Sequence, residues 1–535
     1  MFFLQRVIEF TNIHFLCASH ALNQRSLTKR TTILFFALTL LTSNPWNSPA
    51  FAHGAHHNLG ERIKLSPLSR FKVGPFDTGS AESAAFDPIS KVAFVTNAYS
   101  KSVDAISLID PEIPSLEFSI DLSDHGRVNS VAIKNNHLAI AVESKNPQDV
   151  GAILLFDTQG NRVTSFEAQF MPDMVTFSHD EKLILCANEG EANSQRDPEG
   201  SITVVELNWQ SIENSQVTHI GFNQYKRNNI DPLIKISPGA NTVAQDFEPE
   251  YIAISQDSKT AWVSLQENNA IAEINLEEKQ VKHIHALGFK DHSMPFNALD
   301  ASDKDNKIEV RTWPVKGMYQ PDSIANYDVD GKAYIVTANE GDSRDSEVTR
   351  AAKLSTRVNA QNTPNRLKVL SRQFNNNSEA SELISFGGRS FSIWDESGNQ
   401  VFDSGADFET ITARDYPALF NQSDKRSDDR GPEPEALTIG KIGQSTYAFI
   451  GLERTGGIMI YNISKPSSAF FVDYYNNRSP KLAENDFNAG DIAPESLVFV
   501  NSKNSPNGKP FLISANEVSG TLSLYKIEKA PHKDR

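Results

Sequence analysis

The stretch PESLVF (residues 494–499) is followed by FLISANE (residues 511–517) and GTLSLY (residues 520–525). Each segment is short and rich in residues that favour strands, and polar turns containing Gly, Asn and Pro separate the three. The run therefore predicts three antiparallel strands joined by turns. The first strand opens with an acidic residue after a proline, and the second ends at an Asn-Glu pair.

The same arrangement recurs six more times upstream. The residues that open the seven copies are, in chain order, Glu82, Asn129, Asp173, Glu250, Asp322, Glu435 and Glu495. Repeated groups of short strands are typical of a β-propeller. We therefore predict an all-β fold, a seven-bladed β-propeller over residues 68–528. Because the last copy ends after three strands, we expect residues 68–73 to supply the outer strand of blade seven and close the ring.

The later copies are further apart in the sequence than the first ones. We expect long insertions at about residues 190–248, 276–320 and 343–430. Insertions between repeats map to loops on one face of such a ring, and these loops usually carry binding functions.

The N-terminal region has the features of an export signal. Basic residues at positions 25–30 precede an apolar run at 33–41 and a small-x-small sequence at 50–52. The apolar run is shorter than the roughly 20 residues that cross a bilayer. We predict a signal peptide over residues 1–52, a flexible mature N-terminus over 53–67 and a short tail over 529–535, with no transmembrane span in the mature chain. The protein is expected to be exported to the periplasm or the extracellular space.

The charge balance excludes one class of partner. The chain has 51 Lys+Arg against 67 Asp+Glu, a net charge of −16, whereas a nucleic-acid binder needs a basic surface. Removal of the signal peptide would leave Cys186 as the one cysteine, so no intramolecular disulfide is expected. Its apolar neighbours indicate a buried thiol without a chemical role.

Carboxylates recur at equivalent positions of the repeats. Since the innermost strand of each blade begins at the central channel, residues that open this strand should form a ring around the axis. The ends of the second strands contribute Glu143, Glu189, Glu267, Glu340, Glu453 and Glu517. So many like charges need compensation, and a hard divalent cation such as Ca²⁺ suits oxygen ligands. The predicted metal ligands are Glu82, Asp173, Glu189, Glu250, Asp322, Glu340, Glu435, Glu453, Glu495 and Glu517.

Two alternatives stay open at this stage. The repeated acids could instead cap turns by accepting hydrogen bonds from backbone N–H groups. Arg430 and Arg454 could bind a phosphate group beside the metal, or they could be counter-ions of the carboxylates. The candidate catalytic residues are Glu435, Arg430 and Arg454. The usual nucleophile, P-loop and zinc-protease motifs do not occur in the sequence.

Four segments, at residues 297–305, 313–322, 337–342 and 431–435, resemble the choice-of-anchor I family, bacterial relatives of mesenchyme-specific cell-surface glycoproteins. The resemblance implies an exported propeller, and members are described as calcium-associated or alkaline-phosphatase-like.

Three hypotheses follow. In the first, an exported propeller binds a divalent cation, Ca²⁺ above all, in its acidic channel and has a cell-surface or extracellular binding role. In the second, the chain is a metal-dependent phosphomonoesterase of the phytase-like kind that acts on a phosphorylated small molecule. In the third, it is a protein-interaction scaffold without metal. Metal content and chelator-sensitive turnover distinguish them.

Overall fold

The computed structural model describes residues 62–192, 196–354, 362–372 and 382–530. The predicted signal peptide and the start of the predicted mature chain lie outside these residues. Among the described helices, none is long and apolar enough to cross a membrane.

The described residues form seven four-stranded antiparallel sheets, each built from short strands of the repeated pattern. The strands, sheet by sheet, are β2 (Ser80–Asp87), β3 (Val92–Asn97), β4 (Ser102–Ser107) and β5 (Ser115–Asp121); β6 (Val128–Lys134), β7 (His137–Val142), β8 (Ala152–Asp157) and β9 (Arg162–Glu167); β10 (Pro172–Phe177), β11 (Leu183–Asn188), β12 (Ser201–Glu206) and β13 (Gln216–Gly221); β14 (Pro249–Ile254), β15 (Thr260–Leu265), β16 (Ala270–Asn275) and β17 (Gln280–Ala286); β20 (Ile324–Val329), β21 (Lys332–Asn339), β25 (Ser390–Asp395) and β26 (Gln400–Asp403); β27 (Pro434–Ile442), β28 (Ser445–Leu452), β29 (Ile458–Asn462) and β30 (Phe470–Tyr475); β31 (Pro494–Val500), β32 (Phe511–Asn516), β33 (Thr521–Lys529) and β1 (Ile63–Lys72).

The first strands of the sheets contact one another in cyclic order. β2 contacts β6, and the contacts continue through β10, β14, β20, β27 and β31, which contacts β2 again. This closed ring of radial sheets is a β-propeller, so the all-β propeller prediction is confirmed. Apolar clusters fill the spaces between neighbouring sheets, as in the cluster that packs Leu185, Val204, Ile252 and Val263. Cys186 is a free, buried thiol, as predicted.

The first and last strands of the described chain join in one sheet. β1 pairs antiparallel with β33, from Ile63 opposite Lys529 to Lys72 opposite Thr521. The predicted closure of the ring is therefore confirmed. The strand begins at Ile63, earlier than predicted, so part of the segment expected to be flexible (53–67) is paired. The reason is that Ile63 and Leu65 alternate into the core, where they are 1% and 3% exposed.

The expected insertions contain blade strands as well as extra elements. β12 and β13 lie within 190–248, β17 lies within 276–320, and β25 and β26 lie within 343–430, so these ranges are not continuous insertions. The additional elements are β18 (Phe289–Asp291), β19 (Lys316–Met318), β22 (Val348–Arg350), β23 (Lys368–Leu370), β24 (Ile384–Ser385), α1 (Val243–Asp246), α2 (Ala351–Leu354), α3 (Asp407–Asp415), and the 3₁₀ turns η1 (Ile212–Asn214), η2 (Pro295–Asn297), η3 (Asp345–Glu347), η4 (Pro466–Ser468) and η5 (Phe487–Ala489).

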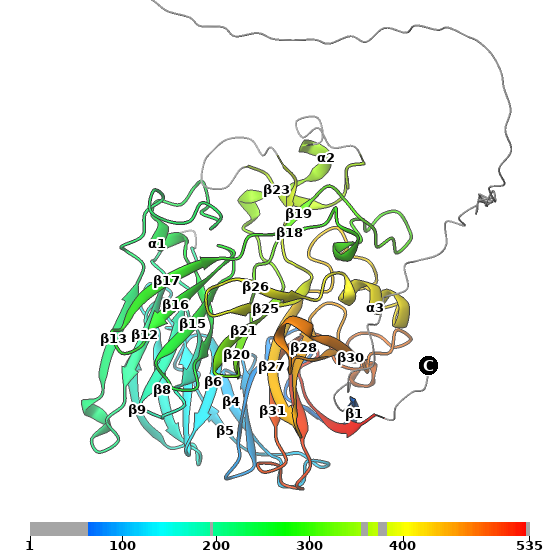
Figure 1. The fold of residues 1–535 in the computed structure, drawn as a ribbon. Coiled ribbons are helices and arrows are strands. Elements are labelled where there is room, and N and C mark those ends of the chain that lie inside the picture. The colour runs from blue at the N-terminus through cyan, green and yellow to red at the C-terminus, as the bar shows by residue number, and fades with distance from the viewer. Residues whose placement is uncertain (1–61, 193–195, 355–361, 373–381, 531–535) are drawn as a thin grey trace, which may run out of the picture. The chain divides into compact units, whose positions relative to one another are not determined.

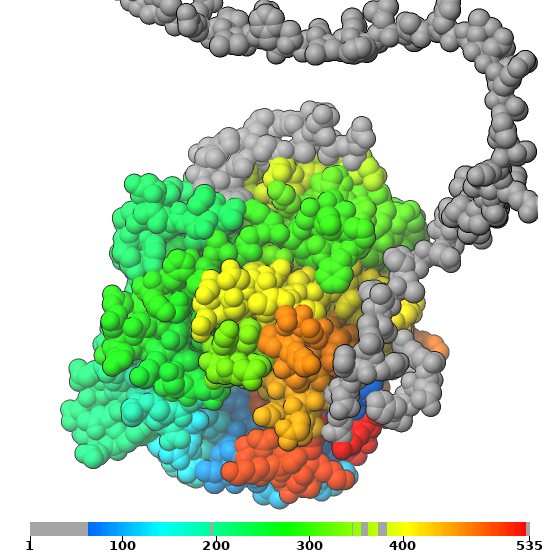
Figure 2. All heavy atoms as spheres, in the orientation of Figure 1, coloured from blue at the N-terminus to red at the C-terminus, as the bar shows by residue number. Residues whose placement is uncertain are grey.

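Several of these elements gather at one end of the ring. β18, β19, β23 and α2 lie together there in Figure 1, and green and yellow-green atoms from this part of the chain occupy the same end in Figure 2. Nine apolar side chains, including Leu299, Trp313, Leu354 of α2 and Val369 of β23, pack into a small core of their own. The insertions therefore form a folded layer, the insertion layer, at one end of the ring.

Candidate metal centre

The backbone at the start of the innermost strands explains where the acids point. Met171, Gln320, Glu433 and Ala493 have left-handed φ angles of 51°, 48°, 52° and 56°, and each precedes a proline and then an acid. In β10, β27 and β31 the pairing register shifts immediately after this proline, and in β14 it shifts after Pro249. A bulge of this kind redirects a side chain out of the regular strand alternation. The acidic residue after the proline therefore lies outside the regular pairing of its strand with the next one.

Five of the predicted ligands come together at one place in the ring, and we call them the central carboxylate cluster: Asp322, Glu340, Glu435, Glu453 and Glu495. One carboxylate oxygen from each of Asp322, Glu340 and Glu435 lies within 4.8 Å of the others, and the same holds for Glu435, Glu453 and Glu495. The two groups share Glu435. Groups of three oxygens at this spacing are close enough to surround one cation.

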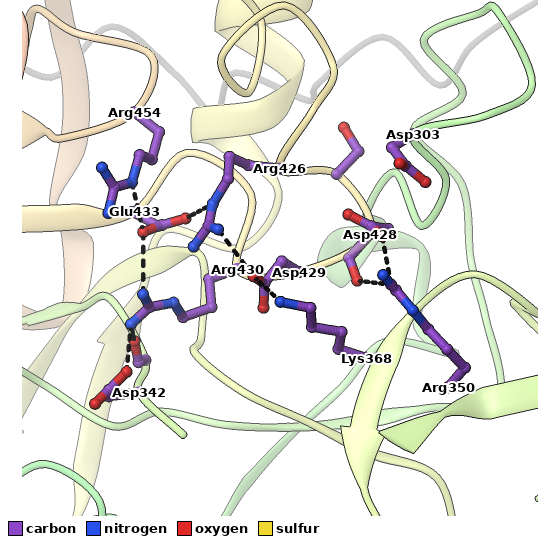
Figure 3. Close-up of polar contacts among 12 residues, drawn as sticks. Asp303, Asp342, Arg350, Lys368, Arg426, Asp428, Asp429, Arg430, Glu433 and Arg454 are labelled. Atoms are coloured by element: carbon purple, nitrogen blue, oxygen red, sulfur yellow. Dashed lines mark hydrogen bonds and ion pairs between the residues drawn. The ribbon is translucent and has the colours of Figure 1, made fainter. Parts of the chain in front are cut away.

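A third group of the same spacing joins Glu340 and Glu453 to Glu433, which was not among the predicted ligands. Glu433 differs from the others because three arginines hold it. Arg426 Nε lies 2.6 Å from Oε1, and Arg454 Nε and Arg430 Nη2 lie 3.0 and 3.5 Å from Oε2 (Figure 3). Burial opposes ionisation, but these guanidinium groups lower the pKa of Glu433 to about 2. Both carboxylate oxygens of Glu433 are therefore already paired with arginine side chains.

The other predicted ligands lie outside these groups of three. Glu82 pairs with Arg127 at 2.9 Å, and Glu517 lies 4.0 Å from the same guanidinium. Asp173, Glu189 and Glu250 belong to neighbouring sheets, and after the larger effect of burial the charges of Glu267, Asp322, Glu189 and Asp173 raise the pKa of Glu250. Within the described part of the chain, these residues join no set of three metal-competent groups.

Burial sets the protonation of the central carboxylate cluster. It raises the pKa of Asp322, Glu435, Glu453 and Glu495 well above the usual value, and neighbouring carboxylates raise it further. For Glu340, burial raises the pKa to about 7, although Arg430 counteracts it. Oε2 of Glu435 is buried without a hydrogen-bond partner. A buried acceptor left without a donor is costly, and a bound proton or cation removes that cost.

The two predicted sets of acids have different partners. Among the ends of the second strands, Glu340, Glu453 and Glu517 have arginines within salt-bridge distance. At the starts of the first strands, five acids form no salt bridge with any described residue: Asp173, Glu250, Asp322, Glu435 and Glu495. The arginines thus pair with half of the acids at the ends of the second strands, whereas Glu82 is the one acid at the start of a first strand with a salt bridge among the described residues.

Arg430 and Arg454, the candidate phosphate-binding groups, both lie against carboxylates. Arg430 Nη1 is 3.3 Å from Glu340 and 2.8 Å from Asp342, and Arg454 Nη1 is 2.7 Å from Glu453. These contacts favour the counter-ion role over the phosphate-binding role. Glu435, the third catalytic candidate, belongs to two of the groups of three.

Three further ion-paired groups were not among the predicted site residues: Arg127, Glu248 and Glu433. Glu248 is 1% exposed and lies 2.7 Å from Arg344. Glu433 stands in the segment GPEPE (residues 431–435), two residues before Glu435, and this alternation was the one signal that could have identified it. For Arg127 and Glu248 the sequence offers no comparable pattern.

Residues 82–466 match the choice-of-anchor I domain along most of the repeated region. The chain belongs to the choice-of-anchor I family. The curated relatives of this family member include Gigasin-3a of Magallana gigas. The two sequences are 30% identical over 164 residues, which cover 27% of this chain and 58% of that protein. A mesenchyme-specific cell surface glycoprotein of Strongylocentrotus purpuratus is 25% identical over 357 residues, covering 55% of this chain and 42% of the relative. The chain thus spans about half the length of these relatives.

Solved structures are similar to this family member at low identity. The hydrazine synthase of Kuenenia stuttgartiensis matches with a TM-score of 0.47 and 12% identity, over 85% of this chain and 98% of that one. The Cps50 (Swd1) β-propeller domain of Myceliophteria thermophila matches with a TM-score of 0.41 and 7% identity, over 87% and 99% of the two chains.

Proposed function

We propose that this choice-of-anchor I protein is exported and binds a divalent cation, Ca²⁺, in the central carboxylate cluster, as part of a cell-surface or extracellular binding role. The observation that carries the proposal is the pair of three-oxygen groups that share Glu435. The surface role is supported by the family and by the cell-surface glycoprotein among the relatives.

The chemistry of the cluster favours calcium among the divalent cations. All the candidate ligands are carboxylate oxygens, which suit hard cations. Ca²⁺ accepts six to eight oxygen ligands in flexible geometry, whereas Mg²⁺ keeps several waters and is usually held by one or two carboxylates. A crowded set of five acids without a matching set of arginines is better suited to Ca²⁺. When bound, the cation would supply positive charge to the three acids that have no salt bridge, Asp322, Glu435 and Glu495.

Calorimetric titration of the chelator-treated protein with CaCl₂ tests the proposal, together with metal analysis of the purified protein. Glu435→Gln should abolish or strongly weaken binding, because Glu435 belongs to both groups. Glu277→Gln is the matched control, since Glu277 is exposed on a turn away from the channel. If the unaltered protein does not bind Ca²⁺, the proposal is wrong, and the third hypothesis, a protein-interaction scaffold without metal, describes the protein better.

The alternative function is a metal-dependent phosphomonoesterase acting on a phosphorylated small molecule. Hydrolysis of p-nitrophenyl phosphate, measured with and without chelator, tests it on the same protein. Chelator-sensitive turnover that Glu435→Gln removes would support the enzyme, whereas calcium binding without turnover would support the binding role.

A further inference from the structure

Glu340 already has one cationic and one neutral hydrogen-bonding neighbour. Arg430 Nη1 lies 3.3 Å from Oε1 of Glu340, and Gln266 donates a hydrogen bond to Oε2 at 2.9 Å. The same carboxylate contributes an oxygen to the group with Asp322 and Glu435. Both oxygens of Glu340 therefore have partners before any cation enters, in contrast to Oε2 of Glu435, which has none.

A cation bound by Asp322, Glu340 and Glu435 would need a Glu340 oxygen at about 2.3–2.6 Å. The guanidinium of Arg430 is paired with that same carboxylate. Because the Arg430 side chain is only 16% exposed, water screens its positive charge poorly. Two positive charges would then share one buried carboxylate and repel each other. Cation binding and the Arg430–Glu340 ion pair thus oppose each other.

Arg430 has other acceptors that allow it to release Glu340. Its Nη1 lies 2.8 Å from Asp342 and also donates to the carbonyl oxygen of Gly341. Its Nη2 lies 3.5 Å from Glu433, whose position is secured by Arg426 and Arg454. An unpaired buried charge would be strongly unfavourable. The guanidinium of Arg430 avoids this cost, because its other acceptors remain when Glu340 turns toward a cation.

The segment that carries Arg430 is attached to the insertion layer (Figure 3). Arg426 contacts Asp429 at 3.0 Å, and Asp429 contacts Lys368 of β23 at 2.6 Å. The backbone N–H of Lys368 donates to the carbonyl oxygen of Asp428 at 2.8 Å. The insertion layer thus holds Arg430 in place beside the cluster.

We infer that Arg430 is an internal competitor of the divalent cation and sets the affinity of the central carboxylate cluster for it. This inference rests on the proposed function, since it concerns the same site. It assigns the insertion layer a role in the site, because that layer positions the competing charge.

Calorimetric titration of the full chain with CaCl₂ tests the inference. Arg430→Met removes the competing charge, so we expect the Kd for Ca²⁺ to fall by about tenfold or more, as loss of one nearby like charge at an effective dielectric of ~20 implies. Arg430→Lys keeps the charge and should change the Kd by less than about threefold, a difference well below the charge effect. Arg366→Met is the matched control, since Arg366 pairs with Asp303 and Asp428 at 2.8 and 3.2 Å, outside the cluster, and should leave the Kd unchanged.

The outcomes separate this inference from the proposed function. If the unaltered protein binds no Ca²⁺, the proposed function is wrong. If it binds Ca²⁺ but a folded Arg430→Met variant binds equally or more weakly, the role of Arg430 is wrong while the site stands. Thermal unfolding shows whether each variant is folded, and Arg430→Gln, which removes the charge but keeps hydrogen-bonding groups, replaces Arg430→Met if that variant does not fold.

Discussion

Arg70 of β1 and Asp491, in the loop before β31, form an ion pair in which Nε lies 2.9 Å from Oδ1. Asp491 is 3% exposed and also accepts hydrogen bonds from the hydroxyl groups of Thr521, Ser523 and Tyr525. One carboxylate thus ties the first strand of the described chain to the last one. The ring is closed by polar contacts as well as by strand pairing.

We expect Asp491→Ala to lower the free energy of unfolding by about 3–5 kcal/mol, because it leaves Arg70 and the hydroxyl groups without their shared acceptor. Urea unfolding followed by circular dichroism measures the loss. Glu112→Ala is the control, since Glu112 pairs with Lys526 at 3.6 Å on the surface. It should cost less than about 1 kcal/mol. Equal losses in the two variants would contradict a special role for Asp491.

Glu433→Gln should also destabilise the protein, because three arginines would lose the charge that neutralises them. The expected loss is about 3–5 kcal/mol, the range for breaking a buried ion pair. Glu484→Gln serves as comparison, since Glu484 is 53% exposed and pairs with Arg478 at 3.2 Å. A loss no larger than that of the surface variant would show that the arginines find other partners.

Stability of the metal-free protein should fall as the pH rises from about 6.5 to 8. Burial raises the pKa of Glu340 from 4.5 to about 7 and raises the pKa of Glu435 well above its usual value, so the folded state binds more protons than the unfolded state in this range. More protons bound in the folded state mean that stability decreases with pH. His292, whose pKa burial lowers to about 3, acts in the opposite direction, but only below its ordinary value of 6.5.

Thermal unfolding in the presence of chelator measures this dependence. Adding CaCl₂ should reduce the fall if the cation replaces the protons in the cluster, and Glu340→Gln should reduce it without calcium. A melting temperature that rises between pH 6.5 and 8 in chelator would contradict the raised pKa values.

The thiol of Cys186 should be unreactive in the native protein. It is fully buried, and burial raises its pKa well above the ordinary value, so little thiolate forms and reagents have no access. A Cys17→Ser variant, which leaves Cys186 alone, should react with a thiol reagent slowly in buffer and rapidly in urea. Rapid labelling under native conditions would show that the strand around Cys186 opens locally.

The repeated segments allowed much of the fold to be predicted. Alternating apolar residues with Gly and Asn turns predict antiparallel strands from local chemistry alone, and the missing outer strand predicted that β1 would pair with β33. The ranges expected to hold insertions also contain blade strands, because some excursions lie between strands of one sheet, as where β25 pairs with β21. The repeated acids were also visible in the sequence, since each stands at the same point of its repeat.

The sequence by itself thus determined the all-β propeller and which carboxylates recur at equivalent positions of its repeats. Only the tertiary structure decided which of them meet and which are neutralised. Glu340 and Glu435 come close although 95 residues separate them, and Arg430 contacts Glu340 rather than Glu435. Such pairings depend on distances between residues of neighbouring sheets, and the strength of each charge depends on its burial. Neither quantity is contained in the local pattern of residues.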